Sequence, residues 1–226
     1  IKKKINEAEE TLKKEQLEFC PVFNCDTLHP KKKFHHNKKF GIGKIFEVER
    51  SLLSFFGFPA YGVHCNAWSK KNNSTFIHIA KRSKKIKKFP GLLDNLVAGG
   101  QPSNISIIGN LKKEGFEEAG LIKSHFKNLK KGSTIHYCHN EKKNINSAII
   151  FVYDLEINKD FIFKNIDGEV EGFFNIEINE IYKILENRQL KPNCIIPLAD
   201  FFVRKLKNEF PKKGINEIKR ILRTYE

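Results

Sequence analysis

Three glutamates close together in the chain could carry the chemistry of this protein. Glu114, Glu117 and Glu118 are spaced i, i+3 and i+4, so on a helix their carboxylates project from one face. Hard divalent cations such as Mg²⁺ prefer oxygen ligands and leave positions for water and phosphate oxygens. The spacing therefore indicates a metal site, although by itself it fits the solvated acidic face of an ordinary amphipathic helix at least as well.

The helix that must carry these acids is predicted over residues 108–119. Its neighbouring face holds apolar or small residues, which are Ile108, Leu111, Gly115 and Ala119. The helix can therefore bury one side and turn its acids toward a cleft. Gly120 is a residue type that suits a helix C-terminus.

Strand and helix patterns follow one another along the rest of the chain. Short β-branched or apolar runs predict strands over 61–68, 75–80, 95–98, 134–138, 148–157 and 170–176. Further helical patterns cover 179–187 and 198–209, and Pro192 and Pro197 place the start of the second one near Leu198. The predicted fold class is α/β, with an α+β type of mixed sheet flanked by helices.

The N-terminal part differs from the rest of the chain in its pattern of apolar and polar residues. Residues 1–19 predict a charged helix, and residues 20–44 have no periodicity and predict a loop. The cysteines and histidines of this part superficially suggest zinc, but their spacing matches no closed structural template; they are Cys20, Cys25, His29, His35 and His36. We expect an N-terminal extension over 1–56, a main domain over 57–210 and a C-terminal helix over 211–226.

Composition limits the classes of partner. The net charge of +15 would suit nucleic acid, but the lysine runs lie along the whole chain, at 2–4, 31–33, 84–88, 130–131 and 212–213. The spread therefore favours a solvated basic surface over a dedicated nucleic-acid surface. An odd number of scattered cysteines favours a reducing compartment, and no apolar run approaches the roughly 18 residues of a membrane span. We expect a cytoplasmic protein without membrane contact.

The segment from Gly99 to Leu121 resembles the Nudix box. That box has the general pattern Gly-x5-Glu-x7-Arg-Glu-U-x-Glu-Glu-x-Gly-U, in which U is apolar. The positions that match in register are Gly99, Glu114, Glu117, Glu118, Gly120 and Leu121. The departures are Ile105 in place of the first Glu, Lys113 in place of Arg, and Gly115 in place of the apolar residue.

Flanking segments between Ile45 and Arg204 resemble one Nudix subfamily, which is related to and sometimes fused to thiamine pyrophosphokinase. They include Phe89-Pro90-Gly91, Leu93-Asp94-Asn95, Asp167-Gly168-Glu169-Val170-Glu171 and Asp200-Phe201-Phe202-Val203-Arg204. In that subfamily Lys at the Arg position and a missing first Glu are usual. Gly109 stands where relatives tend to carry Glu, so Gly109 and Gly115 mark positions at which activity could be weakened.

The resemblance implies roles for particular residues. Glu114, Glu117 and Glu118 would hold Mg²⁺ or Mn²⁺, with Glu117 and Glu118 as the catalytic acids and Glu118, or a route through metal-bound water, supplying the base. Gly99, Gly100 and Gln101 would contact the substrate. From the residues themselves, Glu169 or Glu171 could be a supplementary ligand or base, or a surface acid flanking a strand. Lys81 and Arg82 could clamp phosphate oxygens or be solvated.

The whole sequence thus predicts a Nudix α/β/α sandwich with a small N-terminal extension, acting as a metal-dependent pyrophosphohydrolase. The subfamily resemblance implies thiamine diphosphate or its oxidised forms as substrate, cleaved to the monophosphate. An oxidised nucleoside diphosphate such as 8-oxo-dGDP is the second choice. An alternative from another class is a catalytically weak or silent Nudix fold that binds a phosphorylated ligand or RNA.

Overall fold

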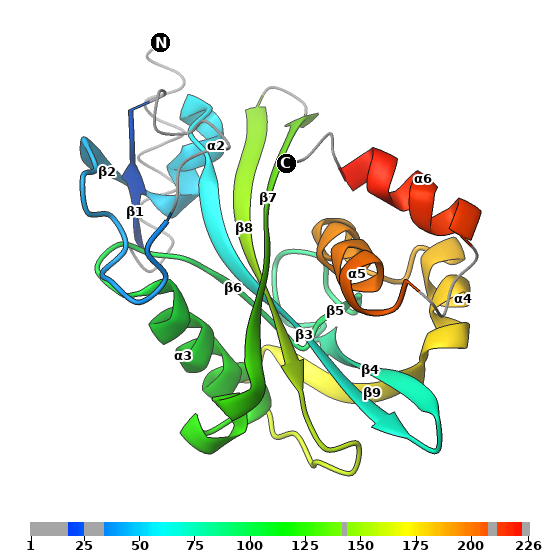
Figure 1. The fold of residues 1–226 in the computed structure, drawn as a ribbon. Coiled ribbons are helices and arrows are strands. Elements are labelled where there is room, and N and C mark those ends of the chain that lie inside the picture. The colour runs from blue at the N-terminus through cyan, green and yellow to red at the C-terminus, as the bar shows by residue number, and fades with distance from the viewer. Residues whose placement is uncertain (1–17, 25–33, 142–143, 208–211, 223–226) are drawn as a thin grey trace. The chain divides into compact units, whose positions relative to one another are not determined.

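The computed structural model describes residues 18–24, 34–141, 144–207 and 212–222 (Figure 1). The predicted helix over 1–19 lies almost wholly outside these ranges, as do Cys25 and His29. The chain divides into two compact units, which are described separately. Unit 1 comprises residues 1–62, 100–109 and 136–150, and unit 2 comprises 63–99, 110–135 and 151–226. The domain boundaries expected near residues 57 and 210 stay predictions.

A seven-stranded sheet confirms the predicted mixed α/β class. Its strand order is β5-β4-β3-β8-β7, with β6 paired to β3 and β9 paired to β4. The strands are β3 Ala60–Lys71, β4 Ser74–Arg82, β5 Leu93–Asn95, β6 Val97–Gly100, β7 Leu129–Glu141, β8 Asn144–Glu156 and β9 Val170–Glu177. Strand β7 extends beyond the predicted 134–138 at both ends, and β8 begins before the predicted 148–157, because the apolar runs mark the buried part of a strand and not its polar ends.

The predicted strand over 95–98 is in fact two strands. β5 pairs antiparallel with β4, and β6, which follows after Leu96, pairs with β3. The chain therefore changes its neighbour within one short apolar run. Sequence periodicity could not show this, because it indicates extended backbone and not the partner that completes its hydrogen bonds.

Helix α5, Pro192–Lys205, packs on one face of the sheet in unit 2. Ile77 of β4 and Ile176 of β9 are partners across the sheet and share a buried cluster with Leu198 and Phe201 of α5. In Figure 1 the C-terminal part of α3 (Ile107–Ala119) and helix α5 lie on opposite sides of the long strands. The remaining helices of the described ranges are α2 Leu53–Phe56, α4 Ile181–Glu186 and α6 Lys212–Leu222, with 3₁₀ turns at Arg50–Leu52, Lys123–Asn128 and Ile178–Glu180.

The predicted start of α5 near Leu198 is wrong. The helix begins at Pro192, and Pro197 lies inside it. Proline is favoured at the first helical position, where its missing N–H has no partner to lose. Pro197 removes one helical hydrogen bond, but it is buried, and Leu198 and Phe201 after it pack on the sheet. Tertiary packing therefore overrides the local signal.

The predicted loop over residues 20–44 is also wrong at its start. In unit 1, β1 (Phe19–Val22) pairs antiparallel with β2 (Phe46–Glu49), with Cys20 opposite Val48. Phe23, Phe34, Phe40 and Tyr61 form an aromatic cluster beside this pair, with ring centroids 4.9–6.2 Å apart. These contacts join segments that are distant in sequence, so local periodicity could not predict them.

Among the described residues, no helix combines the length and the apolar character that crossing a bilayer requires.

Candidate metal centre

The helix that carries the three glutamates starts and ends as its sequence predicts. It begins after Ser106, whose hydroxyl accepts a hydrogen bond from the Gly109 N–H at 3.0 Å, as an N-cap residue does. It ends at Gly120, which has a positive φ of 68° and donates its N–H to the Phe116 carbonyl. Glycine adopts this left-handed conformation without strain.

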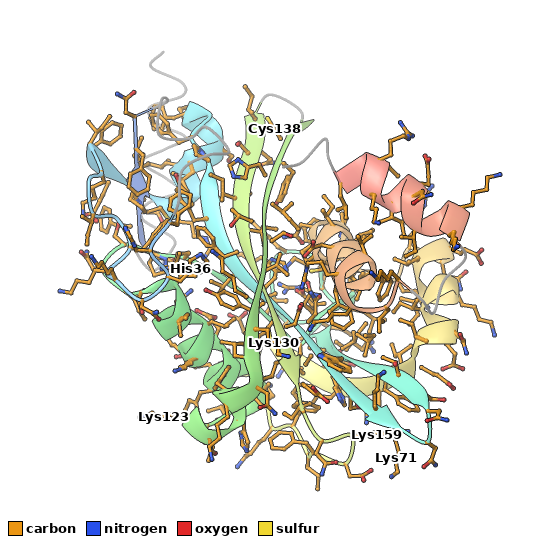
Figure 2. The ribbon with its side chains drawn as sticks, viewed as in Figure 1. His36, Lys71, Lys123, Lys130, Cys138 and Lys159 are labelled. Carbon is orange, nitrogen blue, oxygen red and sulfur yellow. The ribbon has the colours of Figure 1, made fainter. Side chains whose placement is uncertain are left out.

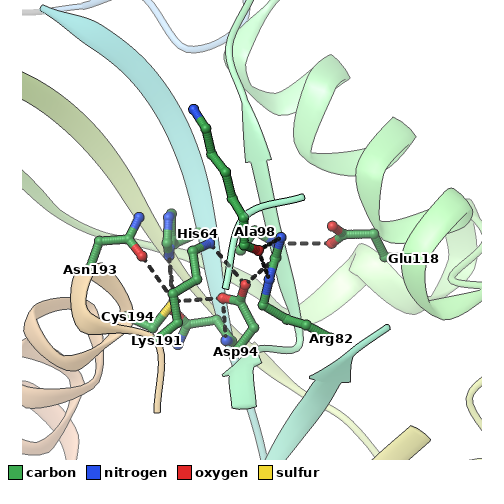
Figure 3. A network of polar contacts seen from close by, with 10 residues as sticks. His64, Arg82, Asp94, Ala98, Glu118, Lys191, Asn193 and Cys194 are labelled. Carbon is green, nitrogen blue, oxygen red and sulfur yellow. Dashed lines mark hydrogen bonds and ion pairs between the residues drawn. The ribbon is translucent and has the colours of Figure 1, made fainter. Parts of the chain in front are cut away.

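Glu118 is the most buried of the three acids, with 7% of its surface exposed. Its Oε2 accepts the backbone N–H of Ala98 in β6 at 2.9 Å (Figure 3). Burial raises the pKa of Glu118 well above its ordinary value, and the charges of Asp94, Glu114 and Asp167 act in the same direction. Without a metal, this carboxylate is therefore prone to take up a proton.

Glu114 lies against the next residue of β6. A Cβ added to Gly99 would overlap the carboxyl group of Glu114, so the missing side chain makes the space that this carboxylate occupies. Only 18% of the Glu114 side chain is exposed. Consecutive residues of β6 thus fix two acids, Gly99 by close approach and Ala98 by a hydrogen bond to Glu118.

Lys113 already places a positive charge among these acids. Its ammonium lies 2.6 Å from Glu117 Oε2 and 3.3 Å from Glu114 Oε1. Partial burial acts to lower the pKa of Lys113, but the hydrogen bond to Glu117 and the charge of Glu114 outweigh it and raise the pKa. Carboxylate oxygens are the ligand type that Mg²⁺ or Mn²⁺ prefers. The roles of Glu114, Glu117 and Glu118 as metal ligands stay predictions.

The turn before β9 brings another acid toward the helix. The N–H groups of Ile166 and Asp167 donate to the Glu117 carbonyl at 2.9 and 3.2 Å, and the Asp167 side chain accepts the Glu169 N–H at 2.8 Å. Asp167 was not among the predicted site residues. The signal for it was the Asp-Gly pair, which is typical of a turn that closes on an adjoining element.

Two of the predicted site residues are paired with each other. Lys81 of β4 and Glu171 of β9 form an ion pair at 3.1 Å, with side chains 31% and 39% exposed. Glu169 is exposed and accepts the Ser83 N–H through its carbonyl at 2.8 Å. The roles of Glu169 and Glu171 as supplementary ligands, and of Lys81 as a substrate contact, stay predictions.

Arg82 has a structural task in addition to the predicted substrate contact. Its guanidinium donates to Asp94 at 2.7 Å and twice to the Lys88 carbonyl, at 3.2 and 3.1 Å. Arg82 therefore ties the end of β4 to β5 and to the loop between them.

Gly100 and Gln101, which were predicted to contact substrate, belong to unit 1. The Arg50 guanidinium occupies the space where a Gly100 side chain would be. Gln101 is fully buried, and its Nε2 donates to the Pro102 and Ile105 carbonyls at 3.0 and 3.1 Å. The structure thus gives these residues a part in holding the turn before α3, and their substrate contacts stay predictions.

The structure explains the Gly115 departure from the Nudix box, whereas the hydrogen bonds of Ile105 involve only its backbone carbonyl and do not explain the missing Glu side chain. A Cβ on Gly115 would lie 2.8 Å from the ring of Phe126, so that ring fills the volume that an apolar side chain would take. Ile105, which stands at the first Glu position, accepts hydrogen bonds through its carbonyl from Phe40 N and Gln101 Nε2. Both residues are therefore integrated into packed structure.

Replacing Gly99 by alanine should weaken metal binding while leaving the fold intact. The new methyl group would displace the Glu114 carboxylate, which lies at the end of a flexible side chain and can move. Loss of such positioning typically costs about 10- to 100-fold in metal affinity. Mn²⁺ affinity, followed by the electron paramagnetic resonance of free Mn²⁺, is the measurement.

Gly214→Ala is the matched control for this variant, because nothing lies within 4 Å of a Cβ added to Gly214. Unchanged Mn²⁺ affinity in Gly99→Ala would show that Glu114 does not need its position against β6.

Comparison with known proteins identifies the class. No family model matches the chain. It is 36% identical over 166 residues to "Nudix hydrolase 20, chloroplastic" of Arabidopsis thaliana, covering 73% of this chain and 44% of that protein. It is 33% identical over 166 residues to "Nudix hydrolase 24, chloroplastic" of the same organism, covering 73% and 46%. The chain thus spans about half the length of the curated relatives it matches.

A solved structure supports the fold. DR0079 from Deinococcus radiodurans superposes with a TM-score of 0.56 at 13% identity, covering 81% of this chain and 99% of that one. This likeness shows a shared mixed α/β fold, and the two sequence relatives are both named Nudix hydrolases. The chain is similar over part of its length to proteins named Nudix hydrolases. The relation to thiamine pyrophosphokinase stays a prediction.

Proposed function

We propose that this protein hydrolyses a diphosphate linkage with the help of a divalent cation held by Glu114, Glu117 and Glu118. The observation that carries the proposal is the anchoring of Glu114 and Glu118 on consecutive residues of β6, Glu118 by the Ala98 N–H and Glu114 by its close approach to Gly99. Crowded, partly buried acids are unfavourable without a compensating cation. The Nudix relatives support the same reading.

The reaction would be attack of water on one phosphorus, with cleavage of the bridging P–O bond and release of phosphate and a monophosphate. Bound Mg²⁺ or Mn²⁺ would neutralise oxygens on which charge builds and lower the pKa of a bound water. Glu118 is the residue that we expect to accept the proton, because its anchored carboxylate keeps Oε1 free of the Ala98 hydrogen bond. Glu117 lies one residue earlier on the same helix face and would complete the ligand set.

The loop between β4 and β5 would supply positive charge for the substrate phosphates. This loop, residues 83–92, is closed by hydrogen bonds between Arg82 and both Leu92 and Gly91. Its exposed lysines are Lys84, Lys85, Lys87 and Lys88. The Ser83 N–H binds the Glu169 carbonyl at 2.8 Å, and the Asp167 turn that precedes Glu169 binds the Glu117 carbonyl. The loop is therefore linked to α3, the helix that carries the three glutamates, through the single turn at Asp167.

Exposed lysines also occur on other elements of unit 2, such as Lys71 at the end of β3, Lys123 and Lys130 (Figure 2). Basic charge is thus spread over several elements, which agrees with its spread in the sequence. Lys123 lies on the 3₁₀ turn that follows α3, whereas the loop lysines are linked to α3 through the turn at Asp167.

Changing Lys84, Lys85 and Lys88 together to glutamine should raise KM about tenfold with little change in kcat. Each exposed charge contributes up to about 1 kcal/mol to binding an anion, and about 1.4 kcal/mol corresponds to tenfold. Interactions made equally with substrate and transition state change KM alone. Steady-state kinetics at low and high salt test this, since screening should shrink the difference.

A triple change of Lys212, Lys213 and Lys219 on α6 removes the same charge from another exposed surface and is the control. An equal rise of KM in this control would assign the effect to net charge and not to the loop.

The substrate follows from the subfamily resemblance. We propose thiamine diphosphate or its oxidised forms, cleaved to the monophosphate, with an oxidised nucleoside diphosphate such as 8-oxo-dGDP as the second choice. A screen of these compounds for phosphate release, with Mg²⁺, with Mn²⁺ and with chelator, tests the proposal. Metal-dependent release from one of them supports it. Absence of release from all of them, with retained binding of a phosphorylated ligand or RNA, would establish the silent Nudix fold instead.

We also propose a cytoplasmic location. The two Arabidopsis relatives are named chloroplastic, so imaging of the full-length protein in its own cells is the test.

A further inference from the structure

Asp94, His64 and Cys194 form a buried cluster beside β6, and their potential ligand atoms lie within 4.8 Å of one another. Two cationic side chains already pair with this cluster. Asp94 Oδ2 binds Arg82 at 2.7 Å and Lys191 at 2.9 Å (Figure 3). The Cys194 thiol donates to Asp94 Oδ1, and His64 Nδ1 lies 2.8 Å from Asn95 Oδ1. A further metal ion would add charge where positive charge is in excess. The cluster is therefore a network of ion pairs and hydrogen bonds.

Asp94 is the centre of this network. Its carboxylate accepts hydrogen bonds from Arg82, Lys191, Cys194 and the Asn95 N–H, and it is only 2% exposed. Burial acts to raise the pKa of Asp94, but the charges of Lys191 and His64 and the hydrogen bonds outweigh it and lower the pKa. A buried carboxylate with this many donors is charged and fixed in place.

Backbone hydrogen bonds also join β5, the strand of Asp94, to the segment that leads into helix α5. Leu93 N donates to the Gln189 carbonyl at 2.9 Å, and Lys191 N donates to the Leu93 carbonyl at 2.8 Å. β5 therefore pairs with β4 on one side and with the segment before α5 on the other. Lys191 is the N-cap residue of α5, so its side chain and its backbone both join that helix start to β5.

Helix α5 is held over the sheet at two further points. Asn66 of β3 donates to the Pro197 carbonyl at 3.1 Å, and Arg204 pairs with Asp154 of β8 and with Asp200. Asn95 of β5 belongs to the same hydrogen-bond network, because its Nδ2 donates to Asn66 Oδ1 at 2.9 Å. The start of α5 is thus hydrogen-bonded to β5, and later residues of the helix are bonded to β3 and β8.

We propose that Asp94 is a positioning residue of the metal site, which acts by fixing β5 and the β6 backbone that follows it. Three residues separate Asp94 from Ala98, whose N–H holds Glu118, and the next residue, Gly99, receives Glu114. A shift of β5 would therefore move the anchors of two acids at once. This inference rests on the proposed function, because those acids are positioned for a metal.

Lys191→Met tests the proposal with the least damage. It removes one partner of Asp94 but leaves the Arg82 pair in place, and methionine keeps an apolar stem of similar length. We expect Mn²⁺ binding about tenfold weaker and faster amide hydrogen exchange at residues 97–99. Lys191→Arg, which restores the charge, should recover most of the affinity. Lys205→Met, at the exposed end of α5, should behave as wild type.

A merely structural role would lower the thermal midpoint of Lys191→Met but leave Mn²⁺ affinity and exchange at residues 97–99 as in wild type. That result would overturn the proposal. If wild type itself binds no Mn²⁺, the proposed function fails separately, and the exchange at residues 97–99 still decides whether Asp94 fixes the β6 backbone. Asp94→Asn provides a second variant for the same measurements.

Discussion

Glu118→Gln should reduce metal-dependent hydrolysis on the order of 10³-fold, because glutamine can neither accept the proton nor offer a charged ligand oxygen. The glutamine carbonyl can still accept the Ala98 N–H that Glu118 Oε2 accepts at 2.9 Å. The variant should therefore fold normally and keep the position of α3. Initial rates with saturating Mg²⁺ give the change in kcat.

The free energy of unfolding shows whether a loss of activity in Glu118→Gln is caused by unfolding. The folded-state pKa of Glu118 is raised, so its contribution to stability is present at low pH and is lost as pH rises through that pKa. Glu118→Gln removes this loss, and without metal the variant should be at least as stable as wild type at neutral pH. Urea unfolding measures this.

Glu186→Gln is the matched control, since Glu186 is an exposed acid of α4. A Glu118→Gln protein that turns over substrate at the wild-type rate would refute the assignment of Glu118.

Acidification should destabilise the protein strongly through His64. This histidine is 4% exposed, and burial, followed by the charge of Lys191, lowers its pKa to about 4. The unfolded chain takes up the proton near pH 6.5, so stability is lost as pH falls from about 6.5 to about 4. The loss from this residue alone amounts to about 3 kcal/mol.

His64→Gln isolates this effect, because glutamine keeps a donor for Asn95 Oδ1 and does not titrate. Urea unfolding at several pH values between 7 and 4.5 should show a smaller loss of stability in the variant than in wild type. His35→Gln, at an exposed position, should leave the wild-type slope unchanged. Equal slopes in wild type and His64→Gln would mean that His64 is protonated in the folded protein.

Local sequence was sufficient wherever the structure depends on neighbouring residues. The spacing of Glu114, Glu117 and Glu118 placed them on one helix face, and Gly120 ended that helix as predicted. Strands β3, β4 and β9 lie where β-branched runs predicted them. These features follow from side-chain periodicity and backbone preference, which act over a few residues.

Contacts between segments that are distant in the chain could not be predicted from the sequence. Nothing local shows that β1 pairs with β2, or that one apolar run divides into β5 and β6 with different partners. The start of α5 at Pro192 likewise depends on packing against the sheet. Such contacts join residues far apart in sequence, and their free energy outweighs local preference.

The sequence by itself determined that three acids share one helix face, that a glycine pair precedes them and that the motif resembles the Nudix box. Only the tertiary structure decided how two of those acids are held, Glu118 by the Ala98 N–H and Glu114 in the space left by Gly99. The fold likewise decided which residues contact the strands that carry these anchors. It also placed Asp167 beside the helix and assigned Arg82 to Asp94. The physical reason is that spacing sets the direction of a side chain, whereas burial and hydrogen-bond partners come from other segments of the folded chain.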